Sequence, residues 1–168
     1  AEAQATEVAV TMGVAGVDGA TMATARVAGI RTGDGADTVY NHGSLSAAAK
    51  TSSTTVGGTM SLAGVATQDA APGALAEGIT TGGGHDVILN TGSVTVGGLG
   101  ADPMAYAEVG SVGFLSLLNF SSTQFAARAE ASGIRAGAGD DTVVNQGAIH
   151  VGGDDWMARG RIGAFTVE

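Results

Sequence analysis

Short apolar stretches, each interrupted by small polar residues and bounded by glycine, follow one another along the chain. The clearest are "VAVTMGV" at 8–14, "DTVYN" at 37–41, "SVTV" at 93–96 and "AFTV" at 164–167. Their shortness and their β-branched residues are typical of strands separated by turns. No stretch of twelve residues keeps a period of 3.6 between breakers, so we predict an all-β protein with very little helix.

One motif gives this pattern a long period. Its three copies occupy 29–45, 78–94 and 133–149, so the motif recurs about every 50 residues. They share the template G-I-x-x-G-x-G-x-D-x-[VI]-x-N-x-G-x-[LVI], in which seven positions are identical in every copy. Repeats of this kind indicate a solenoid, a propeller or an array.

Small side chains favour the solenoid over the propeller. Aromatic residues make up 4% of the chain, too few for propeller blades, whereas small apolar residues that can stack are abundant. Each repeat is expected to form two rungs of about 25 residues, one with the motif and one with a Met-led stretch starting at Met60, Met104 or Met157. We therefore predict a single parallel β-solenoid (β-helix) domain over 1–168, with three imperfect repeats and about six to seven rungs.

Charge narrows the choice of partners. The net charge is −9, from 16 acidic and 7 basic residues, which disfavours nucleic acid and suits divalent cations. The chain has no cysteine, so disulfides and thiolate chemistry are excluded. No apolar run reaches the length of roughly 18 residues that a membrane span needs, and we predict no transmembrane segment.

The motif resembles two families of secreted repeat proteins. "TGDGADTVY", "TGGGHDVIL" and "AGAGDDTVV" resemble the RTX nonapeptide G-G-x-G-x-D-x-U-x, with the first glycine replaced. The following "NHGSL", "NTGSV" and "NQGAI" resemble the N-x-G-x-I repeat of autotransporter-type β-helical passengers of bacterial surfaces. The resemblance implies a secreted or cell-surface bacterial protein. RTX blocks recur every nine residues, unlike this motif, so the resemblance supports a secreted β-solenoid more than a calcium roll.

The acidic turns allow two interpretations. Sharp corners require positive φ, which we expect at Gly33, Gly35, Gly82, Gly84, Gly137 and Gly139. The motif aspartates Asp37, Asp86 and Asp141 then either cap backbone N–H groups of the turn or bind calcium beside the turn carbonyls. Asp34 and Asp140 would be extra donors in the calcium interpretation. The motif asparagines Asn41, Asn90 and Asn145 are predicted to form an internal amide ladder.

Catalysis has little support in the sequence. His42, His85 and His150 fall at three different positions relative to the motif, as a catalytic or metal-binding trio would not. Polysaccharide lyases and hydrolases built on β-helices use carboxylates at one place on the molecule, whereas the acids here recur with the repeat. We predict no enzyme and no cofactor other than calcium, with a polysaccharide-acting enzyme as a distant third interpretation.

Two segments are predicted to be insertions. The first covers about 46–55 and contains the small polar run "AAAKTSSTT", which we expect to be a solvated loop. The second covers 113–126 and contains Phe114, Phe120 and Phe125. An aromatic segment that occurs once in a chain of small residues is expected to be an interaction surface or an internal cap.

Two function classes stay open. The first is a structural surface protein: a self-assembling subunit of an extracellular filament or sheath, or a stalk segment of an adhesin. Its partner would be a second copy, joined head to tail when "RIGAFTVE" at 161–168 pairs with "AEAQATEVAV" at 1–10. The alternative is a calcium-binding, RTX-like secreted module.

Overall fold

The chain folds entirely into β-structure. A computed structural model describes residues 2–12, 16–60, 63–97, 104–114, 118–152 and 157–167. These residues form sixteen strands and no helix, which confirms the predicted all-β class. It follows that the described part of the chain has no helix able to cross a membrane.

The strands fall into three successive groups of five, which we call layers, followed by one further strand. Layer 1 contains β1 (Glu2–Met12), β2 (Gly16–Thr21), β3 (Thr24–Arg31), β4 (Thr38–Asn41) and β5 (Ser44–Ala47). Layer 2 contains β6 (Lys50–Met60), β7 (Ala63–Ala70), β8 (Gly73–Thr80), β9 (Val87–Asn90) and β10 (Ser93–Val96). Layer 3 contains β11 (Met104–Phe114), β12 (Leu118–Phe125), β13 (Arg128–Arg135), β14 (Thr142–Asn145) and β15 (Ala148–Val151), and β16 (Met157–Val167) follows.

Each strand pairs in parallel with its counterpart in the next layer. The pairs form five sheets: β1-β6-β11-β16, β2-β7-β12, β3-β8-β13, β4-β9-β14 and β5-β10-β15. In the sheet of β4, β9 and β14, Asn41 pairs with Asn90 and Asn90 with Asn145. These asparagines hold the same position in successive copies of the motif, so the three copies lie one above another in register.

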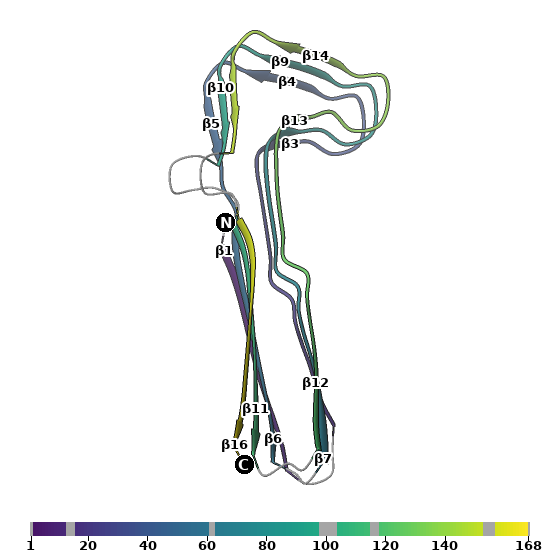
Figure 1. Ribbon diagram of the computed structural model, residues 1–168. Helices are drawn as coiled ribbons and strands as arrows, with labels where there is room; N and C mark the ends of the chain where they lie inside the picture. Colours follow the sequence, from purple (N-terminus) through teal and green to yellow (C-terminus); the bar gives the residue numbers. More distant parts are fainter. Residues whose placement is uncertain are drawn as a thin grey trace.

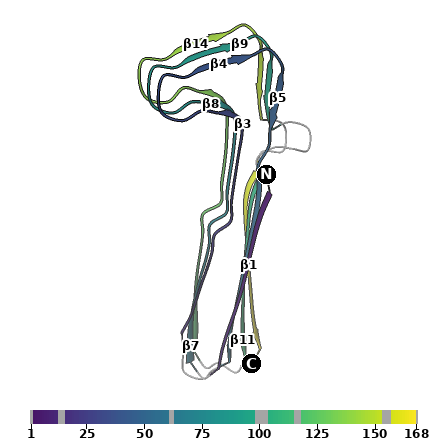
Figure 2. The same cartoon turned by 180° about the vertical axis from the view of Figure 1, so that it is seen from behind.

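The layers follow nearly the same path around the molecule. Figure 1 shows a narrow two-sided body, with β1, β6, β11 and β16 on one side and β7 and β12 on the other. The path widens into a head where β4, β9 and β14 cross between the two sides, and the reverse view in Figure 2 shows the same arrangement. The acidic turns of the motif lie in this head, between β3 and β4 and their counterparts.

Small and branched apolar side chains fill the head. Its buried cluster contains Ala25, Val39, Ala49, Ala74, Ala76, Ile79, Ile88, Val94 and Val96. Equivalent positions share a column through the layers, for example Val39, Ile88 and Val143. Burial of these side chains is the main stabilising contribution that a stack of strands can obtain.

Strands that hydrogen-bond to each other are about 50 residues apart in the sequence, which is about twice the predicted rung length of about 25 residues. Successive strands of one repeat lie in different sheets, so one repeat makes one layer and not two rungs. The described strands form three layers and one strand of a fourth, instead of six to seven rungs. The Met-led stretches do not form separate rungs: Met104 and Met157 begin the long strands β11 and β16, whereas Met60 ends β6.

The predicted insertion at 46–55 is wrong. Ala47 pairs directly with Val96, and the strand β6 begins at Lys50, so no extra loop separates them. Thr51 and Ser53 are buried, and the Ser53 hydroxyl lies against that of Thr21. Val56 lies inside β6 and is not equivalent to Val96 and Val151, which pair with each other.

The segment 113–126 is not an insertion either. Gly113 and Phe114 end β11, and β12 pairs with β7 as the regular third strand of its sheet. The larger number of residues in the third repeat comes instead from the connection between β10 and β11, from Val96 to Met104, which is longer in sequence than the connection between β5 and β6. Met104 pairs with Met157, but Met60 pairs with Phe114, so the three methionines do not share a column. Their side chains lie outside the described part of the structure, and their role as core filler stays a prediction.

Glycine columns allow the turns of adjacent layers to touch. Gly35, Gly84 and Gly139 have φ of 128°, 146° and 137°, as predicted for sharp corners. Gly33, Gly82 and Gly137 do not adopt such a φ. Gly82 and Gly137 are required for a different reason: the turns of adjacent layers lie so close that an added Cβ would collide with the carbonyl oxygen of the glycine one layer before.

Candidate functional site

The motif asparagines form a chain of amide hydrogen bonds through the three layers. Asn41 Nδ2 donates to Asn90 Oδ1 at 2.7 Å, and Asn90 Nδ2 donates to Asn145 Oδ1 at 2.6 Å. At the two ends the amides turn to their own layer: Gly43 N donates to Asn41 Oδ1, and Asn145 Nδ2 donates to the carbonyl of Gly147. The chain is therefore directional, with the amide nitrogens of Asn41 and Asn90 pointing toward the higher-numbered layer.

The motif aspartates form a second column in which the hydrogen bonds run in the same sense, from a backbone N–H of one layer to a carboxylate of the next. Asp37 N donates to Asp86 Oδ1 at 2.9 Å, and Asp86 N donates to Asp141 Oδ1 at 3.0 Å. The carboxylates of Asp86 and Asp141 thus cap a backbone N–H of the layer before their own and not a group of their own turn. Asp86 is only 1% exposed, yet its Oδ2 has no hydrogen-bond partner, and neither does the buried Oδ2 of Asp37. An unsatisfied buried carboxylate oxygen is costly, so this column is a candidate site for a cation.

The other acidic residues of the turns lie on the surface. Asp34 Oδ1 accepts a hydrogen bond from Gly83 N at 3.0 Å, and Asp140 lies 3.9 Å from His85 Nδ1. Among the described residues, no three histidine, cysteine or acidic side chains gather around one point that could hold a metal ion. Any cation at the aspartate column would therefore depend on backbone carbonyls and water for most of its ligands.

The three histidines lie apart from one another. His42 Nδ1 lies 2.6 Å from Thr91 Oγ1, and its ring stacks on Tyr40 with a centroid distance of 6.4 Å. His85 is paired with Asp140 as described, and His150 is exposed on β15. They do not form a common site.

The predicted aromatic interface lies outside the described side chains. Phe114 ends β11, and Phe120 and Phe125 belong to β12. The structure describes the backbone of these residues and not their side chains, so their role at an interface stays a prediction.

The outer surface of the sheet β3-β8-β13 departs most clearly from the repeat. Glu77 is 0% exposed, although its partners in register are Ala28 and Ser132. Its Oε2 lies 3.2 Å from Arg26 Nη2 and 2.5 Å from Arg31 Nη2, and its Oε1 lies 3.4 Å from Arg135 Nη1. Three arginines from the two flanking layers thus surround one buried carboxylate of the middle layer.

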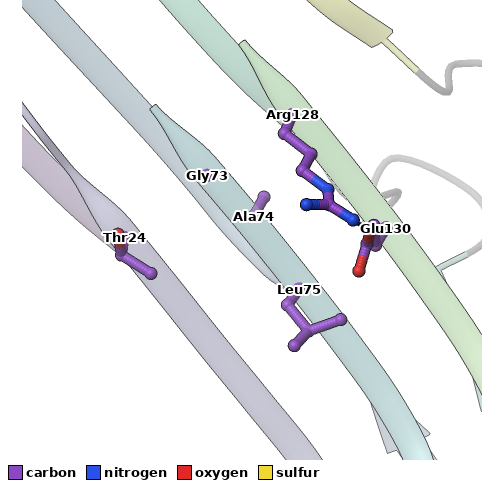
Figure 3. A pocket seen from close by; sticks show the side chains of 6 residues that line it. All are labelled: Thr24, Gly73, Ala74, Leu75, Arg128 and Glu130. Carbon is purple, nitrogen blue, oxygen red and sulfur yellow. Dashed lines mark ion pairs between the residues drawn. The ribbon is translucent and has the colours of Figure 1, made fainter. Parts of the chain in front are cut away.

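A shallow pocket of about 220 Å³ adjoins this cluster. Figure 3 shows its six lining residues: Thr24, Gly73, Ala74, Leu75, Arg128 and Glu130. Thr24, Gly73 and Arg128 share one column, so the missing side chain of Gly73 leaves a notch between the other two. Arg128 forms an ion pair with Glu130 at the rim of the notch (Figure 3).

No protein-family model matches the chain, and neither does any curated protein or solved structure compared with it. The interpretation of the aspartate column and of the Glu77 cluster therefore rests on their geometry. The sequence pattern located the aspartate and asparagine columns but missed the Glu77 cluster. A usable signal was the single acid in "ALAEGI", at the position that is Ala28 in one flanking copy and Ser132 in the other.

Proposed function

We propose that the chain is a structural module of an extracellular filament, sheath or adhesin stalk. In this proposal the protein is a β-solenoid in which each repeat is one layer, secreted to the cell surface and extended head to tail by a second copy. We assign it no catalytic role. The observation that carries the proposal is the unequal burial of equivalent apolar side chains in the three layers.

Inward-facing apolar residues near the motif are covered in the first two layers, and their counterparts in the third are open. In one column, the exposure is 5% at Val39, 0% at Ile88 and 45% at Val143. Ile149 and Val151 of β15 are likewise exposed, although their counterparts Val94 and Val96 are buried. Each layer covers the inward side chains of the layer before it, so the open side of layer 3 has the surface that a further layer would bury.

Hydrogen-bonding polarity supports a head-to-tail contact. The open side of layer 3 carries the backbone N–H of Asp141, whose counterparts at Asp37 and Asp86 donate to the carboxylate of the next layer. Asn145 Nδ2, whose counterparts donate to the next amide, donates instead to the carbonyl of Gly147 in its own layer and would have to exchange this bond. Layer 1 carries the matching acceptors: the carboxylate of Asp37, whose Oδ2 has no hydrogen-bond partner, and Asn41 Oδ1, which accepts from Gly43 N of its own layer. Donors of one copy would face acceptors of the next, which gives an open, heterologous contact and hence a fibre.

A pair of adjacent substitutions tests this proposal. Val143→Asp places a charge on the surface that a further layer would cover, so we expect it to abolish assembly. Val144→Asp adds the same charge to a neighbour in the column of Tyr40 and Leu89, which faces outward, and we expect assembly to persist. Negative-stain imaging and mass photometry of the two variants and the parent chain measure the outcome, with circular dichroism to verify folding.

Two results would contradict the proposal. A parent chain that stays monomeric at all accessible concentrations would exclude self-assembly. Equal effects of the two substitutions would show that assembly does not use the open side of layer 3.

A second candidate function, calcium binding, is favoured by the aspartate column. The buried, unpartnered Oδ2 of Asp86 is the specific observation, since a cation would satisfy it. In this case we expect millimolar calcium to raise the melting temperature of the parent chain, because a ligand that binds only the folded state stabilises it.

Replacing all three column aspartates by asparagine is the decisive comparison. We expect the triple variant Asp37→Asn, Asp86→Asn, Asp141→Asn to retain the capping acceptors and to lose the calcium-dependent shift. Asp18→Asn removes an exposed acid of β2, outside these turns, and serves as the control. If calcium leaves the melting temperature of the parent unchanged, the column has only its capping role.

A further inference from the structure

The outer surface of β3, β8 and β13 is basic on an acidic protein. These strands carry Arg26, Arg31, Arg128 and Arg135, which are four of the seven basic residues of the chain. They carry only two of the sixteen acidic residues, Glu77 and Glu130, so the surface has a net charge of +2 on a chain of −9. We call it the arginine face.

The arginines of this face exceed what Glu77 requires. One carboxylate needs one guanidinium to form a bidentate pair, yet three guanidiniums lie around Glu77. Their side chains are 51%, 41% and 49% exposed for Arg26, Arg31 and Arg135, so each still presents N–H donors to solvent. Glu77 holds the three side chains together without neutralising them, which is the arrangement of a preorganised anion site.

The remaining residues of the face restrict the class of anionic ligand. The three strands contain no aromatic residue on which a nucleobase could stack, so the face offers nothing to the bases of a nucleic acid. A protein partner would need an apolar centre, for which the face offers only Leu75 beside the Gly73 notch. Hydrophilic anionic polymers without nucleobases remain.

We infer that the arginine face binds an acidic polysaccharide. A carboxylate or sulfate group of one sugar lies on the guanidiniums of Arg26, Arg31 and Arg135, and a neighbouring sugar occupies the notch between Thr24 and Arg128. Arg128 and Glu130 at the rim supply a donor and an acceptor for hydroxyl groups. This inference goes beyond the structural role proposed above and does not depend on self-assembly.

Binding of the 168-residue chain to three immobilised polymers tests the inference. We expect binding to polygalacturonate or to dextran sulfate and none to neutral dextran. The first two polymers distinguish carboxylate from sulfate as the recognised group. Glu77→Gln removes the internal competitor for the guanidiniums, so we expect it to lower the Kd about three- to tenfold.

Two double variants distinguish the effect of where a positive charge lies from the effect of the net charge of the chain. Glu77→Gln with Arg135→Gln, and Glu77→Gln with Lys50→Gln, have the same net charge as the parent. Lys50 is exposed on the different sheet β1-β6-β11-β16. We expect the first pair to bind about tenfold more weakly than Glu77→Gln alone and the second to stay within about twofold of it. Keeping Glu77→Gln in both variants avoids leaving a buried charge without its partner.

Three outcomes would overturn the inference. If the chain binds neither anionic polymer, the arginine face is not a site for acidic polysaccharide. Equal losses in the two double variants would mean that only overall charge matters. Loss of self-assembly in the Arg135 variant, without polysaccharide binding in the parent, would assign the face to a second copy. None of these substitutions touches Val143, so failure here leaves the proposed assembly to be decided by its own experiment.

Discussion

At the scale of single residues, glycines at equivalent positions of the motif have different amounts of space around them in different layers. An added Cβ at Gly33 meets nothing within 4 Å, whereas at Gly82 it would collide with the backbone of Gly33. The reason is directional packing, since the turn of each layer rests on the turn of the layer before it. Layer 1 has no such neighbour within the described residues, so its glycine is free of this contact.

Alanine substitutions in this column should therefore differ sharply. We expect Gly82→Ala to lower the free energy of unfolding by about 2–3 kcal/mol, because the turn must move away from the layer beneath it. Gly33→Ala should change it by less than about 0.5 kcal/mol. Urea denaturation followed by circular dichroism measures both. Equal destabilisation by the two changes would contradict the packing direction.

Residue patterns predicted columns well where the residue type is the same in every copy. The motif aspartates and asparagines could be aligned from sequence because identical side chains recur at fixed spacing. Glu77 could not, since its surroundings come from arginines of two other layers, far from it in the sequence. Which oxygen of Asp86 lacks a partner also follows only from the geometry of the stacked turns.

At the scale of strands, the sheets are unequal. The sheet containing β1 has four strands, whereas the other four sheets have three. Pairing β16 of one copy with β1 of the next, as the sequence suggested, would leave a gap one strand thick in the four other sheets. A second copy can stack on β12–β15 without a gap only if β16 takes the place of its β1 beside β6. The two strands are equivalent for this purpose: each has eleven residues and lies at the same side of its layer.

This strand exchange predicts that β1 inhibits assembly. We expect a chain lacking residues 1–12 to assemble faster than the parent, because β16 then finds the edge of β6 already free. A peptide of residues 157–167 should slow assembly of the shortened chain by occupying that edge. Light scattering and negative-stain imaging follow both reactions. A shortened chain that assembles no faster than the parent would show that β1 and β16 do not compete.

Strand type was easier to predict than strand arrangement. β-Branched stretches bounded by glycine identified β4, β10 and part of β16 from sequence alone. The number of strands in a layer depends on which strands hydrogen-bond, which short apolar patterns do not specify. The predicted insertion at 46–55 is wrong for the same reason, since the polar run "AAAKTSSTT" does not reveal that Lys50 begins a strand paired with β1.

At the scale of the whole molecule, the two proposed interactions use different surfaces. Assembly uses the open sides of layers 1 and 3, whereas the arginine face looks outward from all three layers along β3, β8 and β13. An assembled filament would therefore repeat the arginine face once per copy along its length. Sites that are weak individually would then act together on one long polysaccharide through their high effective concentration.

The pairing of every strand with the next layer also has a mechanical consequence. The hydrogen bonds between strands run along the stacking axis, and the five sheets of one boundary carry a pulling force in parallel. Such a boundary resists until its bonds fail together, and failure of one layer releases about 50 residues of chain, or roughly 170 Å when extended. A thread built in this way would lengthen under load in discrete steps of one repeat, and each step would absorb work that could otherwise detach whatever the thread holds.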